Sequence, residues 1–281
     1  MIWALTTVSY RYHLHGFPEV LELARQSGFG AIELWEPHFR RNPSSVLAGI
    51  HNEHGIPVTV FSGYQNLTDF SAGNLSWAKD LKRKLTDCQC VGARVLRLFS
   101  GALSSADAKE VDWQRWFDRI DYANSLAAQA GVELAFETHP GTLLDCVEGV
   151  VRFISAVRDR NWSQVGLNFD AFHVWEFGTD PLACLSSWYP HVKHVHLKNA
   201  SRRTGQFAFT NVYHPTGCYD DLTPLCNGVV NIAALVAWLH VAGYTGAATL
   251  EHFGPPSVDY FREEIASLEQ CLRQSSPSFV S

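Results

Sequence analysis

Residues 132–141 read VELAFETHPG and join an apolar run to a turn through an acid and a histidine. Glu137 and His139 are two residues apart, so on an extended segment their side chains point to the same side. The turn-forming pair Pro140-Gly141 ends the segment. Polar groups at the end of a hydrophobic run are costly unless they have partners. The segment therefore predicts a buried strand that ends at a functional site.

Strand-like and helix-like segments alternate from one end of the chain to the other. The predicted strands cover 2–8, 31–35, 57–61, 94–99, 132–137, 165–170, 192–197 and 247–251. The predicted helices cover 17–26, 44–53, 74–90, 113–130, 146–158, 181–188, 231–242 and 257–273. A long irregular stretch, 201–228, separates the seventh strand from its helix.

Eight strand-then-helix units predict one closed (β/α)8 TIM barrel over residues 1–274, followed by a frayed Ser/Pro tail at 275–281. The alternative is an open, doubly wound sheet. Such a sheet usually carries a glycine-rich phosphate turn after its first strand, and Ser9-Tyr10-Arg11-Tyr12 is not one.

Composition narrows the function classes. The 281 residues are 46% hydrophobic with 9 Trp and 17 Phe, which implies a sizeable core. The formal charge of −6 without a long basic run argues against nucleic acid or an anionic membrane as a partner. No apolar run approaches the roughly 20 residues that span a bilayer, and the N-terminus reads as a first strand rather than a signal peptide. Seven cysteines without a Cys-x-x-Cys pair predict a reducing, cytoplasmic setting.

Polar residues gather where the predicted strands end, which is where TIM barrels carry their active sites. They are Glu33, Arg97, Glu137, Asp170, His196 and Glu251. Two Glu, one Asp and one His converging at a barrel mouth predict a divalent metal ion held by Glu137, Asp170, His196 and Glu251. Oxygen-rich ligation with one imidazole suits Mn²⁺, Mg²⁺ or Co²⁺ better than structural zinc. The alternative is that each acid is a solvated strand-end residue with a local ion pair.

Two neighbours of the proposed ligands are candidate catalytic residues. His139 and Lys198 each lie two residues from a ligand on the same strand face, and either could move protons or polarise a carbonyl. The alternatives are a histidine that only orients Glu137 and a lysine that is a surface charge. Arg97 and Arg11 are candidate clamps for a substrate carboxylate, although Arg11 is equally compatible with a structural salt bridge.

Three further residues complete the candidate site. His173 follows Asp170 closely and would support the metal ligands or serve as a hydrogen-bonded structural histidine. Tyr64 and Tyr213 fall on loops at the same face, where aromatic side chains can close over a ring-shaped ligand or pack beneath the loop. The 201–228 stretch would serve as a lid or as an interface in a homo-oligomer.

These residues match a known pattern. Glu137, Asp170, the segment His194-Val195-His196-Leu197-Lys198 and Glu251 resemble the xylose-isomerase-like barrel superfamily of sugar isomerases and epimerases. Further motifs narrow the resemblance to the bacterial-type 3-dehydroshikimate dehydratases. They are Ser9-Tyr10-Arg11, Ile32-Glu33-Leu34-Trp35, Glu137-Thr138-His139-Pro140, Thr142-Leu143, Asp145, Asn168-Phe169-Asp170, His173-Val174-Trp175-Glu176, Lys198-Asn199, Asn211-Val212-Tyr213 and Phe253-Gly254.

The resemblance implies a metal-dependent lyase that dehydrates the small carboxylate 3-dehydroshikimate to protocatechuate. It implies that Glu137, Asp170, His196 and Glu251 hold one divalent metal ion. It also implies a substrate pocket lined by Tyr64, Arg97, His139, Lys198 and Tyr213. The chain departs from the family pattern at Glu36-Pro37 and at His252.

Three rival functions remain on the same barrel. A ketose isomerase or epimerase would use Glu137 and Glu251 as paired bases around the same metal. A metal-dependent endonuclease needs a basic DNA-facing surface, which the charge of −6 argues against. A non-catalytic sugar-binding barrel would carry a mutated metal set, and none is visible.

Overall fold

The structure is a computed structural model that describes residues 1–41, 55–71, 76–202 and 220–275. Eight parallel strands form a closed barrel in sequence order, with β8 paired back to β1. The strands are β1 Ile2–Thr6, β2 Ala31–Trp35, β3 Val58–Ser62, β4 Val95–Leu98, β5 Glu133–Glu137, β6 Val165–Asp170, β7 Val192–Leu197 and β8 Ala247–Leu250. The predicted TIM barrel is therefore confirmed, and the open sheet is excluded.

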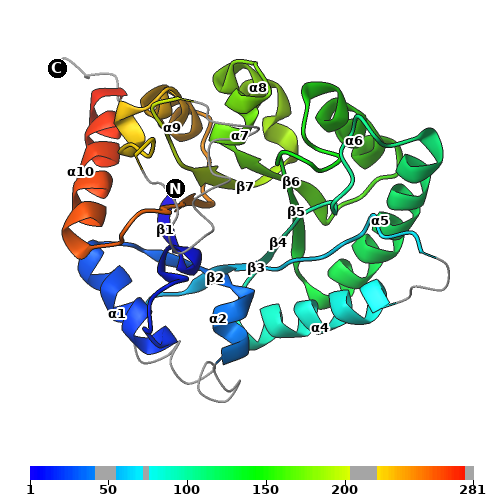
Figure 1. Cartoon of the computed structure of the whole chain (residues 1–281), viewed down its shortest axis with the longest axis horizontal. Coiled ribbons are helices and arrows are strands. Elements are labelled where there is room, and N and C mark those ends of the chain that lie inside the picture. Colours follow the sequence, from blue (N-terminus) through cyan, green and yellow to red (C-terminus); the bar gives the residue numbers. More distant parts are fainter. Residues whose placement is uncertain (42–54, 72–75, 203–219, 276–281) are drawn as a thin grey trace.

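Helices surround the strands as an outer ring (Figure 1). They are α1 Phe17–Ser27, α2 Glu36–Arg41, α4 Ser76–Val91, α5 Glu110–Ala130, α6 Val147–Asp159, α7 Ala171–Glu176, α8 Pro181–Trp188, α9 Ile232–Val241 and α10 Val258–Ser275. The described residues also include short 3₁₀ helices, namely η1 Thr7–Tyr10, η2 Tyr189–His191 and η4 Leu225–Asn227. No helix in the described ranges is long and apolar enough to cross a membrane.

The sequence missed two short helices, α2 and α7, each of which begins directly after a strand. At α7 the cause is Asp170, whose Oδ1 accepts hydrogen bonds from the backbone N–H groups of Phe172 and His173, both at 3.0 Å. Such a side-chain cap lets a helix begin at once. The first strand is also shorter than predicted, because Thr7–Tyr10 turns into η1.

Some predictions fall on residues outside the described ranges. These are the helix at 44–53, most of the irregular stretch together with Tyr213, and the tail from 276 onwards. The described ends of the irregular stretch are joined by an antiparallel bridge between Ala200 and Leu222. Ser275, predicted to begin the frayed tail, is instead the last residue of α10.

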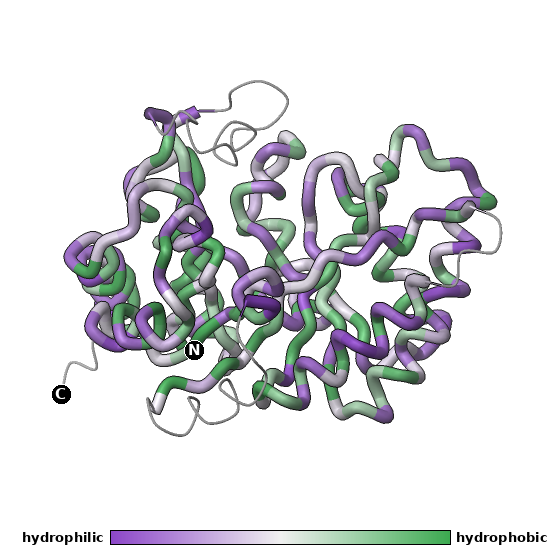
Figure 2. The backbone as a smooth tube through the Cα atoms, turned by 60° about the horizontal axis from the view of Figure 1, so that its bottom comes forward, coloured by the Kyte–Doolittle hydropathy of each residue, from purple (hydrophilic) through white to green (hydrophobic). Residues whose placement is uncertain are grey.

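The main hydrophobic core lies between the barrel and the helices. Phe136 of β5 packs edge-on against Trp116 of α5 and Phe153 of α6, with ring centroids 5.6 and 5.7 Å apart. Phe169 of β6 contacts Trp188 of α8 in the same way. Figure 2 shows hydrophobic and hydrophilic residues alternating at short intervals along the outer helices, as expected where one helix face is buried. The outward strand face is thus apolar.

The inside of the barrel is unusually polar. Bulky branched aliphatic side chains normally fill this space, but here a small alanine cluster of Ala4, Ala31 and Ala247 occupies one part. Buried polar residues occupy much of the rest, namely Glu33, Ser62, Arg97, Asn168, His194, His196 and Thr249. Because buried polar groups are retained only where they are paired or used, the barrel interior leads directly to the candidate site.

Candidate metal centre and active site

Strand register brings the predicted acids and the histidine together. Glu137, at the end of β5, is paired in the sheet with Asn168, and Asp170, at the end of β6, is paired with His196 of β7. Glu251 follows the last residue of β8 directly. These side chains come from the carboxyl ends of neighbouring strands, which brings them to the same end of the barrel.

Three of the four predicted ligands form a compact group. One ligand atom from each of Glu137, Asp170 and His196 lies within 4.8 Å of the others. His196 Nδ1 is 3.6 Å from Glu137 Oε2 and 3.8 Å from Asp170 Oδ2. His196 Nδ1 has no hydrogen-bond partner among the described residues, and Asp170 Oδ2 forms an ion pair with Lys198 Nζ at 2.7 Å. An imidazole nitrogen that faces two carboxylates at these distances is the arrangement that a bound cation requires.

Glu251, the fourth predicted ligand, reaches this group through Lys198. Lys198 Nζ lies 2.6 Å from Glu251 Oε2 and 2.7 Å from Asp170 Oδ2. Burial raises the pKa of Glu251, but the positive charges of Lys198 and His196 outweigh it and bring that pKa below its ordinary value. Glu251 is thus held ionised beside the group and lines the same cavity.

The charge balance fits a divalent ion. The described site contains four buried carboxylates and two permanent cations. The carboxylates are those of Glu33, Glu137, Asp170 and Glu251, and the cations are Arg97 and Lys198. Burial lowers the pKa of His196, yet Glu33 and Glu137 outweigh that effect and raise it to about 9. Burial also raises the pKa of Asp170, against the opposing charge of Lys198. The raised pKa of His196 reflects the negative charge of the carboxylates around it, which a divalent cation would neutralise.

Glu33 is the residue that the sequence did not assign. It is fully buried, and its carboxylate accepts hydrogen bonds from His196 Nε2 at 2.8 and 3.0 Å and from His194 Nε2 at 2.9 Å. Ser62 donates its hydroxyl to the same carboxylate. Burial raises the pKa of Glu33, but the two histidines outweigh it and lower that pKa well below its usual value. The available signal was an acid near a strand end on the inner face, with no indication of its partner.

His139 sits half-buried at the cavity wall with a defined tautomer. Its Nδ1 lies 2.8 Å from the carbonyl oxygen of Pro140, which can only accept, so Nδ1 carries the proton and Nε2 the lone pair. The ring packs edge-on against Phe99 and His173, with centroids 4.7 and 4.5 Å away. Burial and the nearby Lys198 charge lower the pKa of His139 to about 4. A neutral imidazole at pH 7 can accept a proton.

His173 supports His139 from behind. It is fully buried, and its Nδ1 lies 2.7 Å from Glu176 Oε2. Burial, followed by the charge of Lys198, lowers the pKa of His173 well below its ordinary value. The neutral ring therefore donates Nδ1–H to the Glu176 carboxylate. Sequence reasoning found His173 but not Glu176 as its partner.

A cavity of about 280 Å³ opens beside these groups, lined by residues that include Tyr64, Arg97, Phe99, His139, Glu251 and Phe253. Arg97 Nε is 3.0 Å from Glu137 Oε2, and the guanidinium lies over the Phe99 ring, 4.6 Å from its centroid. Arg97 Nη1 is buried without a hydrogen-bond partner in the described ranges. A fixed, desolvated guanidinium with an unused donor at a cavity wall is suited to bind an anion.

Of the other residues predicted to bind the substrate, one lines the cavity and one does not. Tyr64 stands at the rim of the cavity, where its hydroxyl accepts a hydrogen bond of 2.8 Å from Trp35 Nε1. Arg11 does not line this cavity, and its guanidinium donates to the backbone carbonyls of Val8 and Phe253. Tyr213 lies outside the described residues.

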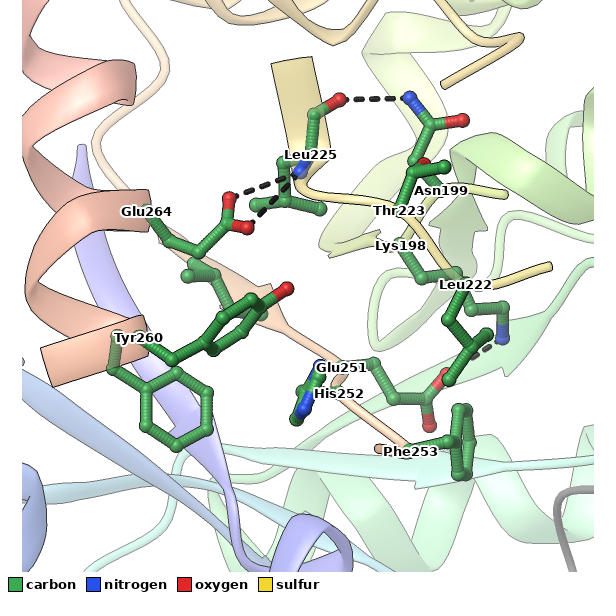
Figure 3. Close-up of a pocket in the computed structure, with 12 residues that line it drawn as sticks. Lys198, Asn199, Leu222, Thr223, Leu225, Glu251, His252, Phe253, Tyr260 and Glu264 are labelled. Atoms are coloured by element: carbon green, nitrogen blue, oxygen red, sulfur yellow. Dashed lines mark hydrogen bonds and ion pairs between the residues drawn. The ribbon is translucent and has the colours of Figure 1, made fainter. Parts of the chain in front are cut away.

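A neighbouring pocket, drawn in Figure 3, shows how the Lys198–Glu251 pair is supported. Asn199 donates its amide to the carbonyl of Leu225 at 2.7 Å, and Glu264 of α10 accepts from the Leu225 backbone N–H at 3.0 and 3.2 Å. These bonds fix the chain around Leu225 between β7 and α10. The support was not visible in the sequence, because its members are far apart along the chain.

Fold and site together define a TIM-barrel protein with buried Glu/His groups consistent with a divalent metal site. Residues 21–271 match the family model described as "Xylose isomerase-like TIM barrel". The chain belongs to this family of barrel enzymes, as its sequence motifs led us to expect.

Several relatives are dehydratases. A 3-dehydroshikimate dehydratase from Bacillus anthracis is 27% identical over 95% of this chain and 96% of its own length. An inosose dehydratase from Klebsiella pneumoniae subsp. pneumoniae is 29% identical over 92% of this chain and 90% of its own. The crystal structure of AsbF, a probable 3-DHS dehydratase involved in petrobactin synthesis in Bacillus anthracis, superposes with a TM-score of 0.84 at 25% identity, covering 96% of this chain and 99% of AsbF.

Proposed function

We propose that the protein is a divalent-metal-dependent hydro-lyase that converts 3-dehydroshikimate to protocatechuate and water. The observation that carries the proposal is Arg97. Arg97 lines the cavity beside the Glu137–Asp170–His196 group, and Nη1 of its buried guanidinium has no hydrogen-bond partner among the described residues. A substrate that bears both a carboxylate and a ketone would satisfy these two features at once. The similarity to a 3-dehydroshikimate dehydratase along nearly the whole chain supports the same substrate.

The reaction requires a proton to leave the carbon between a ketone and a hydroxyl-bearing carbon, followed by loss of that hydroxyl. The difficult step is formation of the enolate. Glu137, Asp170 and His196, with Glu251 beside them, would hold Mn²⁺, Mg²⁺ or Co²⁺, which when bound acts as a Lewis acid. The choice among these ions depends on availability as well as geometry.

His139 is the proposed general base. Its Nδ1–H is committed to Pro140, so Nε2 presents the lone pair, and the Phe99 and His173 rings hold the imidazole in place. A positioned base of this kind contributes about 10²- to 10⁴-fold to a rate. Arg97 would hold the ring carboxylate so that the acidic carbon faces His139. Tyr64 would cover the ring at the rim of the cavity.

Lys198 is the proposed acid and charge stabiliser. Its ammonium lies between Asp170 and Glu251 and is buried, so it acts in a low-dielectric setting. From there it would stabilise negative charge on the enolate oxygen or give a proton to the departing hydroxide. Glu251 would hold the ammonium in place while this happens.

The test is to incubate the purified protein with Mn²⁺ and 3-dehydroshikimate and to follow the absorbance of the aromatic product. Formation of protocatechuate supports the proposal. The competing function is a ketose isomerase or epimerase on the same barrel, with Glu137 and Glu251 as paired bases. Turnover of a ketose without any aromatic product would replace the dehydratase proposal with that one.

A further inference from the structure

Glu33 belongs to β2 and lies across the barrel from the strands that carry the proposed metal ligands. Its carboxylate is the common acceptor for His194, His196 and Ser62, and each of these four residues is at most 1% exposed. A carboxylate held ionised can only accept hydrogen bonds. The nitrogen of His196 that faces it, Nε2, must therefore carry a proton.

The proton on Nε2 determines the state of the other nitrogen of the His196 ring, Nδ1. A histidine that ligates a metal ion is neutral, so with the proton on Nε2 the lone pair of His196 is on Nδ1, which faces Glu137 Oε2 at 3.6 Å and Asp170 Oδ2 at 3.8 Å. Two carboxylates cannot hydrogen-bond to a lone pair, and these distances exceed hydrogen-bond length. Nδ1 therefore points at the position where a cation would sit.

We infer that Glu33 is a positioning residue that fixes the tautomer and orientation of His196, so that Nδ1 is the atom offered to the metal ion. This inference rests on the metal centre of the proposed function. Carboxylates that orient a ligating histidine are a general feature of metal sites, and their loss costs about 10- to 100-fold in metal affinity or activity. His194 and Ser62 hold the Glu33 carboxylate still while it does so.

The first experiment measures Mn²⁺ affinity by electron paramagnetic resonance of the free ion, for the wild type and for Glu33→Gln. Glutamine keeps the shape but carries an amide N–H₂, which meets the Nε2–H of a histidine as donor against donor. We expect Mn²⁺ affinity to fall about 10- to 100-fold. The matched control is Glu36→Gln, a buried carboxylate three residues further along that pairs with Arg40 and Lys84 outside the barrel, and it should leave the affinity unchanged. Equal affinities for Glu33→Gln and wild type would overturn the inference.

The second experiment needs no change at Glu33, so it does not depend on that variant folding. The wild type is labelled with ¹⁵N-histidine, loaded with diamagnetic Zn²⁺, and the side-chain nitrogens are observed by NMR, with His196 assigned by its absence in His196→Gln. We expect a proton on Nε2 and the metal on Nδ1. A metal on Nε2, which would mean that Glu33, His194 and His196 themselves form the site, would overturn the inference.

The outcomes separate this inference from the proposed function. A wild type that binds no Mn²⁺ overturns both. If the wild type binds Mn²⁺ but does not act on 3-dehydroshikimate, the proposed substrate is wrong. The proposed role of Glu33 is still supported in that case, provided that Glu33→Gln binds Mn²⁺ more weakly than the wild type. If the wild type is active but binds Mn²⁺ no better than Glu33→Gln, the proposed function is supported and the proposed role of Glu33 is overturned.

Discussion

The ammonium of Lys198 lies 2.6 Å from the carboxylate of Glu251, and both groups are buried at the carboxyl end of the barrel. The two residues come from neighbouring strands, β7 and β8, and follow the last strand residue in each case. The pair gives Glu251 a role that its sequence position alone did not suggest. It is a candidate metal ligand that also holds Lys198, the proposed catalytic lysine, in place.

The pair leads to a first prediction. Lys198→Met should lower kcat for 3-dehydroshikimate by at least about 100-fold, because the buried cation that would stabilise the enolate is gone. Mn²⁺ binding should persist, since Asp170 and Glu251 lose a competing cation. Steady-state kinetics and Mn²⁺ titration on the same preparation measure both effects. Near-wild-type kcat would show that Lys198 serves only as a counter-ion.

The base assignment gives a second prediction. His139→Gln should reduce kcat by about 10²- to 10⁴-fold while Mn²⁺ stays bound, since His139 is not one of the proposed ligands Glu137, Asp170, His196 and Glu251. The matched control is His240→Gln, an exposed histidine on α9, which should behave as wild type. Retention of near-full turnover by His139→Gln with metal bound would assign the base elsewhere.

A substitution at Arg97 tests whether the substrate carries a carboxylate or is neutral. Arg97→Lys keeps a positive charge beside Glu137 but loses the planar fork that binds a carboxylate through two hydrogen bonds. We expect KM for 3-dehydroshikimate to rise about tenfold or more, equivalent to about 1.4 kcal/mol. If KM is unchanged, the carboxylate is bound elsewhere, and a neutral substrate such as a ketose or an inosose becomes the better candidate.

Metal removal should affect stability as well as activity. A ligand present at 100 times its Kd stabilises the folded state by about 2.7 kcal/mol, which corresponds to an increase in Tm of about 5 °C or more for a domain of this size. Chelation followed by Mn²⁺ addition, monitored by calorimetry, tests this. Asp170→Asn should lose most of the increase. An identical Tm with and without Mn²⁺ would contradict a metal centre in the barrel.

His38 gives a prediction about pH. Burial, with the charge of Arg41, lowers the pKa of His38 from its ordinary 6.5 to about 4 in the folded state. As the pH falls below 6.5 the unfolded chain binds this proton first, so the contribution of His38 to stability is present above pH 6.5 and is lost on the way to pH 4. At about 1.4 kcal/mol per pKa unit the loss approaches 3 kcal/mol.

Urea unfolding of wild type and His38→Gln at pH 7 and pH 4.5 measures this contribution. Other buried histidines affect both proteins equally, so the difference between the two proteins isolates His38. We expect His38→Gln to lose less stability than the wild type between the two pH values. Equal losses would mean that His38 is protonated in the folded state as readily as in the unfolded chain.

The barrel was predictable because its signals are local. Each strand is a short apolar run with a turn or a helix after it, and the bounds of β2, β6, β7 and α8 were predicted without error. The two missed helices, α2 and α7, have six residues each, too short for a helical hydrophobic pattern to register. The start of α7 depends on Asp170 capping the helix with the oxygen that does not face the metal position.

The sequence predicted which residues gather at the candidate site, but it did not predict the contacts between them. Glu137, Asp170, His196 and Glu251 could be found because parallel strands bring their carboxyl ends to one edge, so sequence position at a strand end implies proximity. The Glu33–His196 contact could not be found, since it crosses the barrel between residues that are 163 positions apart.

By itself, then, the sequence determined the architecture, the set of acids and histidines at the barrel mouth, and the family. Those properties depend on hydrophobic periodicity and on residue type, which are read along the chain. The tertiary structure alone decided which oxygen and which nitrogen face each other, that Arg11 is used by backbone carbonyls, and that Lys198 stands between two carboxylates. The reason is that hydrogen bonds and ion pairs depend on distances of a few ångströms between side chains, and barrel closure sets those distances.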